Sequence, residues 1–259
     1  MINNPLVPLR RWDQILLTTS LLLVVGLAWV YLFALADEMA TMGMSGMDMS
    51  MPSMRAWRFS DYWLMFAMWA VMMVGMMVPT ALRAVTIYAR IAHTSSGGSA
   101  VASTWWFILG YIATWTAFSV GATLLQAVLE KIGLLSMAMV SSSAYLGAAL
   151  LIAAGVYQLS PWKDVCLKHC QSPAMYLAGR FGPRAIDGLK LGLSHGAYCL
   201  GCCWLLMGLL FVGGVMNIVW IAAIAGFVLI EKLLPPAYGI SRLSAIAMVC
   251  AGFWLLTIG

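Results

Sequence analysis

Long apolar runs, separated by short stretches of charged and turn-forming residues, dominate the chain from end to end. A helix needs about 20 consecutive apolar residues to cross the hydrocarbon core of a bilayer. The pattern predicts an all-α, polytopic integral membrane bundle, a single domain over residues 1–259 with about seven transmembrane helices. The predicted spans are Ile15–Ala36, Tyr62–Pro79, Thr104–Leu125, Ser143–Leu159, Gly192–Gly213, Val215–Ile230 and Leu243–Ile258.

The composition excludes a soluble globular protein. The chain is 63% hydrophobic and only 9% charged, whereas an ordinary soluble domain is about 25% charged. The net charge of +5 does not imply nucleic acid, because basic residues in a polytopic membrane protein report topology first. The sequence contains no Gly-rich phosphate-binding loop, which argues against a nucleotide-driven pump acting alone.

The distribution of basic residues predicts the orientation. With the N-terminus inside the cell, only Arg55, Arg58 and Lys131 of the 14 basic residues fall on the outer side. Because cytoplasmic loops of membrane proteins carry the excess of Lys and Arg, we predict an N-in, C-out protein of the bacterial inner membrane. This orientation places an extracytoplasmic loop at 37–60 and a cytoplasmic loop at 160–191.

The first span has two features of a secretory signal. Arg10-Arg11 precede the apolar run, and Ala34-Leu35-Ala36 resembles a small-residue cleavage site. The apolar core of a signal is typically 7 to 15 residues long, and this run is longer. We therefore expect the first helix to be retained in the mature protein.

Methionines crowd the predicted outer loop between Asp37 and Arg55, where glycine, serine and proline disfavour a long helix. A thioether is a soft, uncharged donor that selects Cu(I) or Ag(I) and that cannot be lost to a disulfide in an oxidising compartment. We predict that the loop collects a soft metal outside the cell. The alternative is a connector whose methionines contact lipid headgroups or a partner. The predicted ligands are Met42, Met44, Met47 and Met49.

The second span carries a ladder of methionines. At about 100° per residue, Met65, Met68, Met72 and Met76 fall on one face of the helix. The ladder begins where the outer loop ends, so it would relay a soft cation inward by exchange between thioethers. The alternative is plain packing, because Met is an adaptable apolar filler and Gly75 permits close helix contact.

The most specific motif lies in the fifth span. His195, Cys199, Cys202 and Cys203 share one arc of the helix near the bilayer midplane, and Met207 continues that arc. Polar or ionisable groups inside a membrane are costly, so their clustering indicates function. We predict a metal site here; a thiol redox role and plain packing of small apolar side chains are the alternatives.

A companion motif lies in the predicted cytoplasmic loop. Cys166, His169 and Cys170 are spaced so that they share one face if the segment is helical. Nearby lysines favour the thiolate forms that bind metal. A structural zinc site needs four ligands, whereas Cu(I) accepts two or three, so the motif favours copper, with zinc as the alternative metal. Otherwise His169 faces the lipid headgroups.

Three further polar residues lie at the inner ends of predicted spans. We interpret Glu231 and Lys232 as an ion pair at the end of the sixth span; alternatively, Glu231 faces the bundle and couples to protons. Gln158, near the end of the fourth span, is placed where it would contact the cysteine motif. None of these assignments follows from the apolar pattern itself.

Several of these motifs occur in the same order in a known family. Over Tyr62–Lys232 the chain resembles the bacterial family catalogued as predicted metal-binding integral membrane proteins (domain of unknown function 2182). The resemblance implies a metal role without a reaction, and the Met-rich outer loop lies outside it. The matching motifs are Met72–Pro79, Ala154–Pro161, Cys166–Cys170, Ser172-Pro173, Cys199–Trp204, Met207, Gly213–Asn217, Trp220 and Glu231-Lys232.

The sequence therefore predicts a metal-binding membrane protein that handles Cu(I) for uptake, storage or delivery to a partner metalloprotein or membrane complex. Affinity would rise inward, because a thiolate is a stronger Cu(I) donor than a thioether. A thiol–disulfide relay is the alternative, since Cys199 and Cys202 have CxxC spacing. A third reading is a metal- or haem-containing subunit of a membrane oxidoreductase complex, for which His195 is the one haem ligand suggested. No catalytic residues are predicted.

Overall fold

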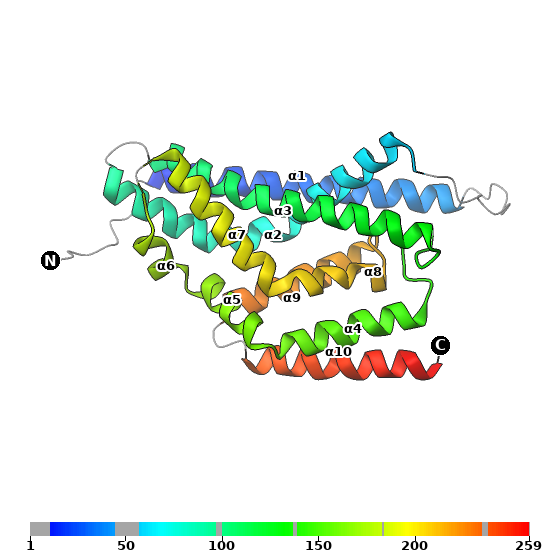
Figure 1. Cartoon of the computed structure of the whole chain (residues 1–259). Coiled ribbons are helices and arrows are strands. Elements are labelled where there is room, and N and C mark those ends of the chain that lie inside the picture. The colour runs from blue at the N-terminus through cyan, green and yellow to red at the C-terminus, as the bar shows by residue number, and fades with distance from the viewer. Residues whose placement is uncertain are drawn as a thin grey trace.

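The computed structural model describes residues 11–44, 57–96, 100–136, 139–182, 184–234 and 238–258. Within these ranges the chain forms helices and no β-strand (Figure 1). The predicted all-α fold is confirmed for this part of the chain. The helices are α1 (Arg11–Met44), α2 (Phe59–Ser96), α3 (Ala100–Lys131), α4 (Ala144–Gln158), α5 (Pro161–Gln171), α6 (Pro173–Gly179), α7 (Ala185–Gly208), α8 (Leu210–Gly213), α9 (Ile218–Leu233) and α10 (Tyr238–Ile258).

Several helices are long and apolar enough to cross a membrane. Among the described residues there are five such segments, in α1, α2, α3, α7 with α8, and α10. α4 and α5 are bent by 67° relative to each other and add a sixth span if the pair is counted as one. α9 has only 16 residues, or about 24 Å at 1.5 Å per residue, which is shorter than a bilayer core. The count of seven and the orientation stay predictions.

The first helix is longer than the apolar run that predicts it. The prediction ended this helix at Ala36, whereas α1 continues to Met44. The residues after Ala36 include glutamate, alanine and methionine, which have high helix propensity, so the helix continues after the apolar run has ended. Met42 therefore lies on the last turns of a helix, where the sequence had indicated a loop.

The predicted cytoplasmic loop at 160–191 is mostly helical. It contains α5, α6 and the first turns of α7, which begins at Ala185 and not at Gly192. A capping box starts α7: the Asp187 carboxylate accepts hydrogen bonds from the backbone N–H and the guanidinium of Arg184 at 3.0 to 3.3 Å. The charged residues that looked like a loop therefore form the N-terminus of this helix.

Glycines bring α7 into very close contact with α3. A Cβ atom added at Gly192 would lie 2.0 Å from the carbonyl oxygen of Phe107, and one added at Gly110 would lie 2.2 Å from that of Leu189. Small residues spaced four apart allow such contact between membrane helices. On α7 the same face continues into Cys199, so the contact with α3 also sets the depth and direction of the cysteines.

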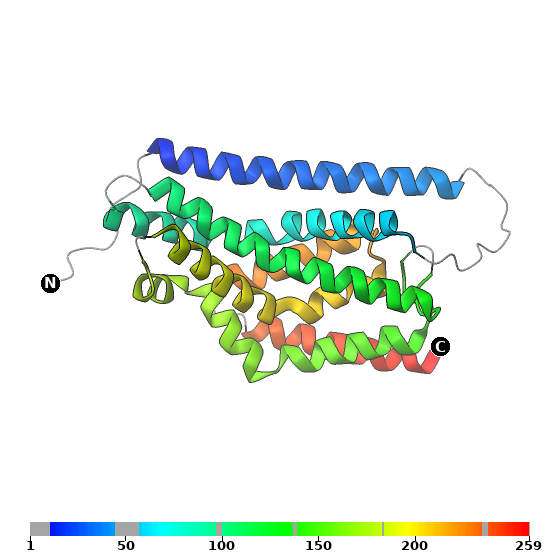
Figure 2. The same ribbon diagram turned by 45° about the horizontal axis from the view of Figure 1, so that its top comes forward.

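The remaining helices lie around this α3–α7 pair. α1 lies along one side of the bundle, and α4 and α10 lie together along the opposite side (Figure 2). α4 and α10 also approach closely, because a Cβ atom at Gly155 would be 2.8 Å from the carbonyl oxygen of Ala245. α2, α7 and α9 lie between these two sides, and their buried side chains form the core around the candidate site.

Candidate metal centre

The cysteines of α7 point into the bundle and away from the surrounding surface. Cys199, Cys202 and Cys203 are only 1%, 2% and 2% exposed, and His195 and Met207 are buried with them. All three thiols belong to the core cluster that joins α2, α3, α7 and α9. The arc of soft ligands that the sequence indicates therefore faces protein, which is the arrangement that a metal site in a membrane bundle requires.

A lysine from α9 reaches this cluster. The Nζ atom of Lys232 lies 2.9 Å from the Sγ atom of Cys199 and 3.8 Å from that of Cys203. It also donates to the hydroxyl of Thr80 at 3.3 Å and lies 4.0 Å from the Sδ atom of Met77. Lys232 is 3% exposed. Since an ammonium group can only donate, it stabilises negative charge on the sulfur that it contacts.

A tyrosine from α3 completes the surroundings of the same sulfur. The hydroxyl of Tyr111 lies 3.1 Å from the Sγ atom of Cys199 and donates to the backbone carbonyl of Met77 at 3.0 Å. Tyr111 is buried, at 2% exposed. The sulfur of Cys199 is therefore contacted from α3 and α9, and both contacting residues are in turn bonded to α2.

The residues of the companion motif on α5 lie in two different environments. Cys170 is buried in the same core cluster as Cys199, Cys202 and Cys203, so it joins the cysteines of α7. Cys166 lies beside it against Gly201, where an added Cβ would be 2.8 Å from the Cys166 Sγ atom. The segment is helical, as the spacing predicts, and its two cysteines face α7. We use the name thiol cluster for Cys170, Cys199, Cys202 and Cys203.

His169 lies outside the thiol cluster. Its ring is stacked on Tyr198, with parallel planes and a distance of 4.1 Å between ring centroids, and Tyr176 contacts it edge-on. The Nδ1 atom lies 2.8 Å from the carbonyl oxygen of Val165. A carbonyl can only accept, so Nδ1 carries the proton in the neutral ring and Nε2 keeps its lone pair. The ring is partly exposed and is able to bind a metal ion through Nε2.

His195 carries a buried nitrogen without a partner. No hydrogen bond to its Nδ1 atom is found among the described residues, although the residue is only 3% exposed. Its ring lies 6.0 Å from that of Tyr111, between centroids. A buried polar atom of this kind is expensive and usually has an explanation, such as a water or an ion. His195 thus remains a candidate ligand, although no contact between it and a thiol is present in the described structure.

The methionines of α2 are buried along the whole ladder. Met68, Met72 and Met76 are at most 1% exposed, while Met65 is partly buried and accepts a hydrogen bond from Gln126. This burial fits packing as well as a relay. Met77, which the predicted ladder leaves out, has its thioether 4.0 Å from the Nζ atom of Lys232, the lysine beside Cys199.

The structure does not test the predicted role of the outer methionines. Met47 and Met49 lie outside the described residues, as do Met51 and Met54. Met42 and Met44 lie at the end of α1, where the structure describes the backbone alone. Metal capture by this segment therefore stays a prediction.

The predicted ion pair between Glu231 and Lys232 is wrong. Glu231 pairs instead with Lys163 of α5, whose Nζ atom lies 2.8 Å from both carboxylate oxygens. Adjacent residues in a helix point about 100° apart, so the two side chains enter different environments. Gln158 donates to Glu231 at 3.1 Å, and so does Ser241 at 2.7 Å. Gln158 therefore belongs to this oxygen cluster, defined as Gln158, Lys163, Glu231 and Ser241.

The donors of the thiol cluster suit a metal of low coordination number. Among the described residues, no three His, Cys, Asp or Glu side chains are arranged so that they could hold a metal ion together. The thiols of Cys202 and Cys203 instead donate to the carbonyl of Cys199 at 3.0 Å each. Rotation of one thiol would supply a second sulfur, which is enough for Cu(I) but not for tetrahedral zinc.

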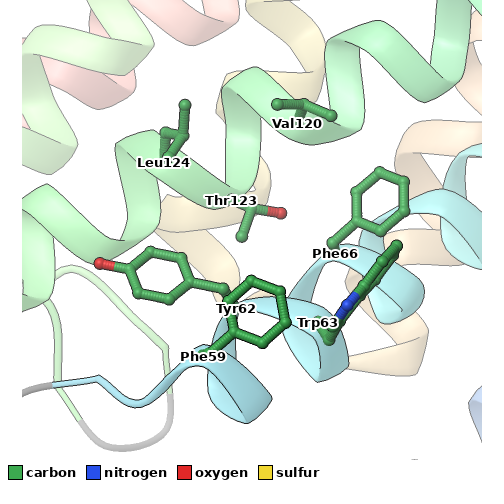
Figure 3. Close-up of a pocket in the computed structure, with 7 residues that line it drawn as sticks. All are labelled: Phe59, Tyr62, Trp63, Phe66, Val120, Thr123 and Leu124. Carbon is green, nitrogen blue, oxygen red and sulfur yellow. The ribbon is translucent and has the colours of Figure 1, made fainter.

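A cavity of about 270 Å³ lies elsewhere, between α2 and α3 (Figure 3). It is apolar and largely aromatic, and its lining contains no thiol, thioether or imidazole. The candidate site around Cys199 is therefore a set of side chains between packed helices, apart from this cavity. The lining residues are Phe59, Tyr62, Trp63, Phe66, Val120, Thr123 and Leu124.

The fold and the candidate site define a class of protein: a bundle of helices long enough to cross a membrane, with buried sulfur side chains beside a lysine in its core. Residues 66–255 match the model of a family described as copper chaperones, PpoB2. Because this match covers most of the chain, the protein belongs to that copper chaperone family. No curated protein and no solved structure matches it.

Proposed function

We propose that the protein is a membrane-embedded chaperone that holds Cu(I) at its thiol cluster and delivers it to a partner metalloprotein. The observation that carries this proposal is the meeting of Cys199 with Cys170, Cys202 and Cys203 in the core of a copper chaperone family member. Thiolates are soft donors, and two of them suffice for Cu(I).

The proposed ligands are Cys199 and one neighbouring thiolate of the thiol cluster, with the thioether of Met77 as a weaker third donor. Cys199 is the common member, because the cluster's other thiols, Lys232 and Tyr111 all surround it. The surrounding low-dielectric protein strengthens the attraction between the metal and its thiolates. Copper is the cargo here, so the site must bind it tightly and still release it.

The buried methionines of α2 are the proposed inward route. They join Met65, near the outer end of the helix in the predicted N-in orientation, to Met77 beside the thiol cluster. Exchange between thioethers and then to thiolates runs toward stronger donors. On the predicted inner side, His169 is the proposed exchange ligand, because it is partly exposed and keeps its Nε2 lone pair. In this scheme α9 also crosses the membrane, which brings the number of transmembrane spans to seven.

Copper analysis of purified protein tests the proposal. The full chain is purified in detergent from copper-supplemented cells, and copper and zinc are measured for wild type, Cys199→Ser and Cys250→Ser. Cys250 is the matched control, because it is an exposed cysteine on α10. We expect stoichiometric copper in wild type and Cys250→Ser, loss of copper in Cys199→Ser, and sulfur-only coordination in the X-ray absorption spectrum. Full copper retention by Cys199→Ser, or zinc alone in wild type, would reject the proposal.

A thiol–disulfide relay is the second candidate function. It is favoured by one observation, the position of Cys170 on α5 next to Cys199 and Cys202 on α7. A relay would form a disulfide between these helices under mild oxidation and would trap a mixed disulfide with a partner in Cys202→Ser. Mass spectrometry of the oxidised protein distinguishes the two functions, because a copper chaperone loses its metal when these thiols are oxidised.

A further inference from the structure

Lys232 is a buried cation whose closest partner is a sulfur atom. Its Nζ atom lies 2.9 Å from the Sγ atom of Cys199, and no ion pair between Lys232 and a carboxylate is present among the described residues. Glu231, the acidic residue next to it, is turned toward Lys163. The remaining contacts of the ammonium group are with the Cys203 sulfur at 3.8 Å and with Thr80 and Met77, which are uncharged.

A charge in this position needs a counter-charge. Burying an unpaired ammonium group in a low-dielectric interior is costly, and within a membrane it is more so. The Cys199 sulfur is the nearest atom able to carry a negative charge.

We propose, building on the proposed function, that Lys232 makes the thiol cluster selective for monovalent soft cations. Two thiolates around Cu(I) leave one negative charge, which the Lys232 ammonium group balances. The bound site then carries no uncompensated charge.

A divalent ion bound by two thiolates would leave the site with a net charge. Two thiolates neutralise Zn(II) by themselves, so the ammonium group would be left as an uncompensated buried charge. A third thiolate would restore neutrality, but no three of these side chains are arranged around a common point in the described structure. The lysine thus favours monovalent over divalent ions by charge, whereas the soft sulfur donors and their low number favour Cu(I) over Zn(II).

The oxygen cluster fixes Lys232 in place. Glu231 precedes it on α9 and is held by Lys163 of α5, and the backbone carbonyl of Glu231 accepts a hydrogen bond from Gln171 at 2.8 Å. The last turns of α9 are therefore anchored on α5. This anchor directs Lys232 toward α7 and α2, so the ammonium group stays beside the thiol cluster when the thiols rotate to take up metal.

Variants at position 232 test the inference in the purified full chain. Binding of Cu(I), of Ag(I) as a redox-inert monovalent probe and of Zn(II) is measured by competition with chelators of known affinity. Lys232→Met and Lys232→Gln remove the charge, and Lys232→Arg keeps it. We expect the neutral variants to bind Cu(I) and Ag(I) on the order of 100-fold more weakly, with the preference over Zn(II) reduced to the same extent. Lys232→Arg should retain most of the preference.

Two results would overturn the inference. One is an unchanged preference for Cu(I) over Zn(II) in both neutral variants; the other is tighter Cu(I) binding in them, which would show that the ammonium group competes with the metal. Loss of binding in Cys199→Ser alongside any of these results leaves the copper function standing.

Discussion

Two lysines are buried in this bundle, and they meet opposite kinds of partner. Lys163 lies between both oxygens of the Glu231 carboxylate, within the oxygen cluster formed by α4, α5, α9 and α10. Lys232 lies among sulfur atoms, a hydroxyl and a tyrosine. The two environments are reached from adjacent residues of α9, since Glu231 belongs to the first and Lys232 to the second.

The difference shows which cluster stabilises the fold and which is suited to chemistry. In the oxygen cluster the charges are matched, and Glu231 accepts from Gln158 and Ser241 as well as from the lysine. Hard partners of this kind join helices together. In the thiol cluster the partners are soft, their negative charge depends on a proton, and the thiols of Cys202 and Cys203 donate to a nearby carbonyl. Such a site is able to exchange a proton for a metal ion.

The largest effect on stability is expected from breaking the ion pair of the oxygen cluster. Lys163→Met leaves the Glu231 carboxylate buried without its cation, so the free energy of unfolding should fall by about 3–5 kcal/mol. Thermal unfolding in detergent measures this loss. Lys168→Met on the same helix is the control, because Lys168 is exposed. Equal stability of the two variants would show that the pair does not join α5 to α9.

An intermediate effect is expected from separating α7 and α3. Gly192→Ala places a Cβ atom where the Phe107 carbonyl oxygen is only 2.0 Å away, so overpacking should cost about 1–3 kcal/mol. It should also lower copper retention, because the thiol cluster depends on the position of α7. Gly121→Ala is the control on α3, since nothing lies within 4 Å of its added Cβ.

The reciprocal change is Gly155→Ala, whose Cβ atom would approach α10 and strain the helices that carry the oxygen cluster. It should lower the thermal unfolding temperature but leave the copper content per folded molecule unchanged. If Gly192→Ala and Gly155→Ala reduce copper content equally, the two clusters are not independent, and the contrast between them would have to be abandoned.

The smallest effect is expected at Tyr111. Tyr111→Phe removes the hydroxyl that contacts the Cys199 sulfur and the Met77 carbonyl, so it should cost about 1 kcal/mol of stability. Copper should be retained but released faster to a chelator, because the thiolate loses one donor. Tyr145→Phe, at an exposed position of α4, serves for comparison. A Tyr111→Phe protein that releases copper at the wild-type rate would limit the tyrosine to a packing role.

Some elements of the fold follow directly from local patterns in the sequence. The apolar runs predict α1, α2, α3, α4, α7, α9 and α10, but several boundaries differ: α1 continues to Met44, α2 continues past Pro79 to Ser96, and α7 begins at Ala185. Pro79 lacks an N–H and was predicted to be the end of its span, yet it lies inside α2. The spacing of Cys199, Cys202 and Cys203 predicts a shared, buried arc. A signal that was overlooked is the spacing of Gly188, Gly192 and Gly196, which identifies the contact face of α7.

The sequence by itself determined most of the helices, which faces carry sulfur and that the chain is built for an apolar environment, because all three depend on spacing along one segment. Only the tertiary structure decided that Glu231 and Lys232 separate, that Cys170 lies in one core cluster with the cysteines of α7 and that Lys232 and Tyr111 reach Cys199. These contacts join different helices. Their partners are set by how closely the helices approach and how they are rotated, and neither quantity can be read from the periodicity of a single helix.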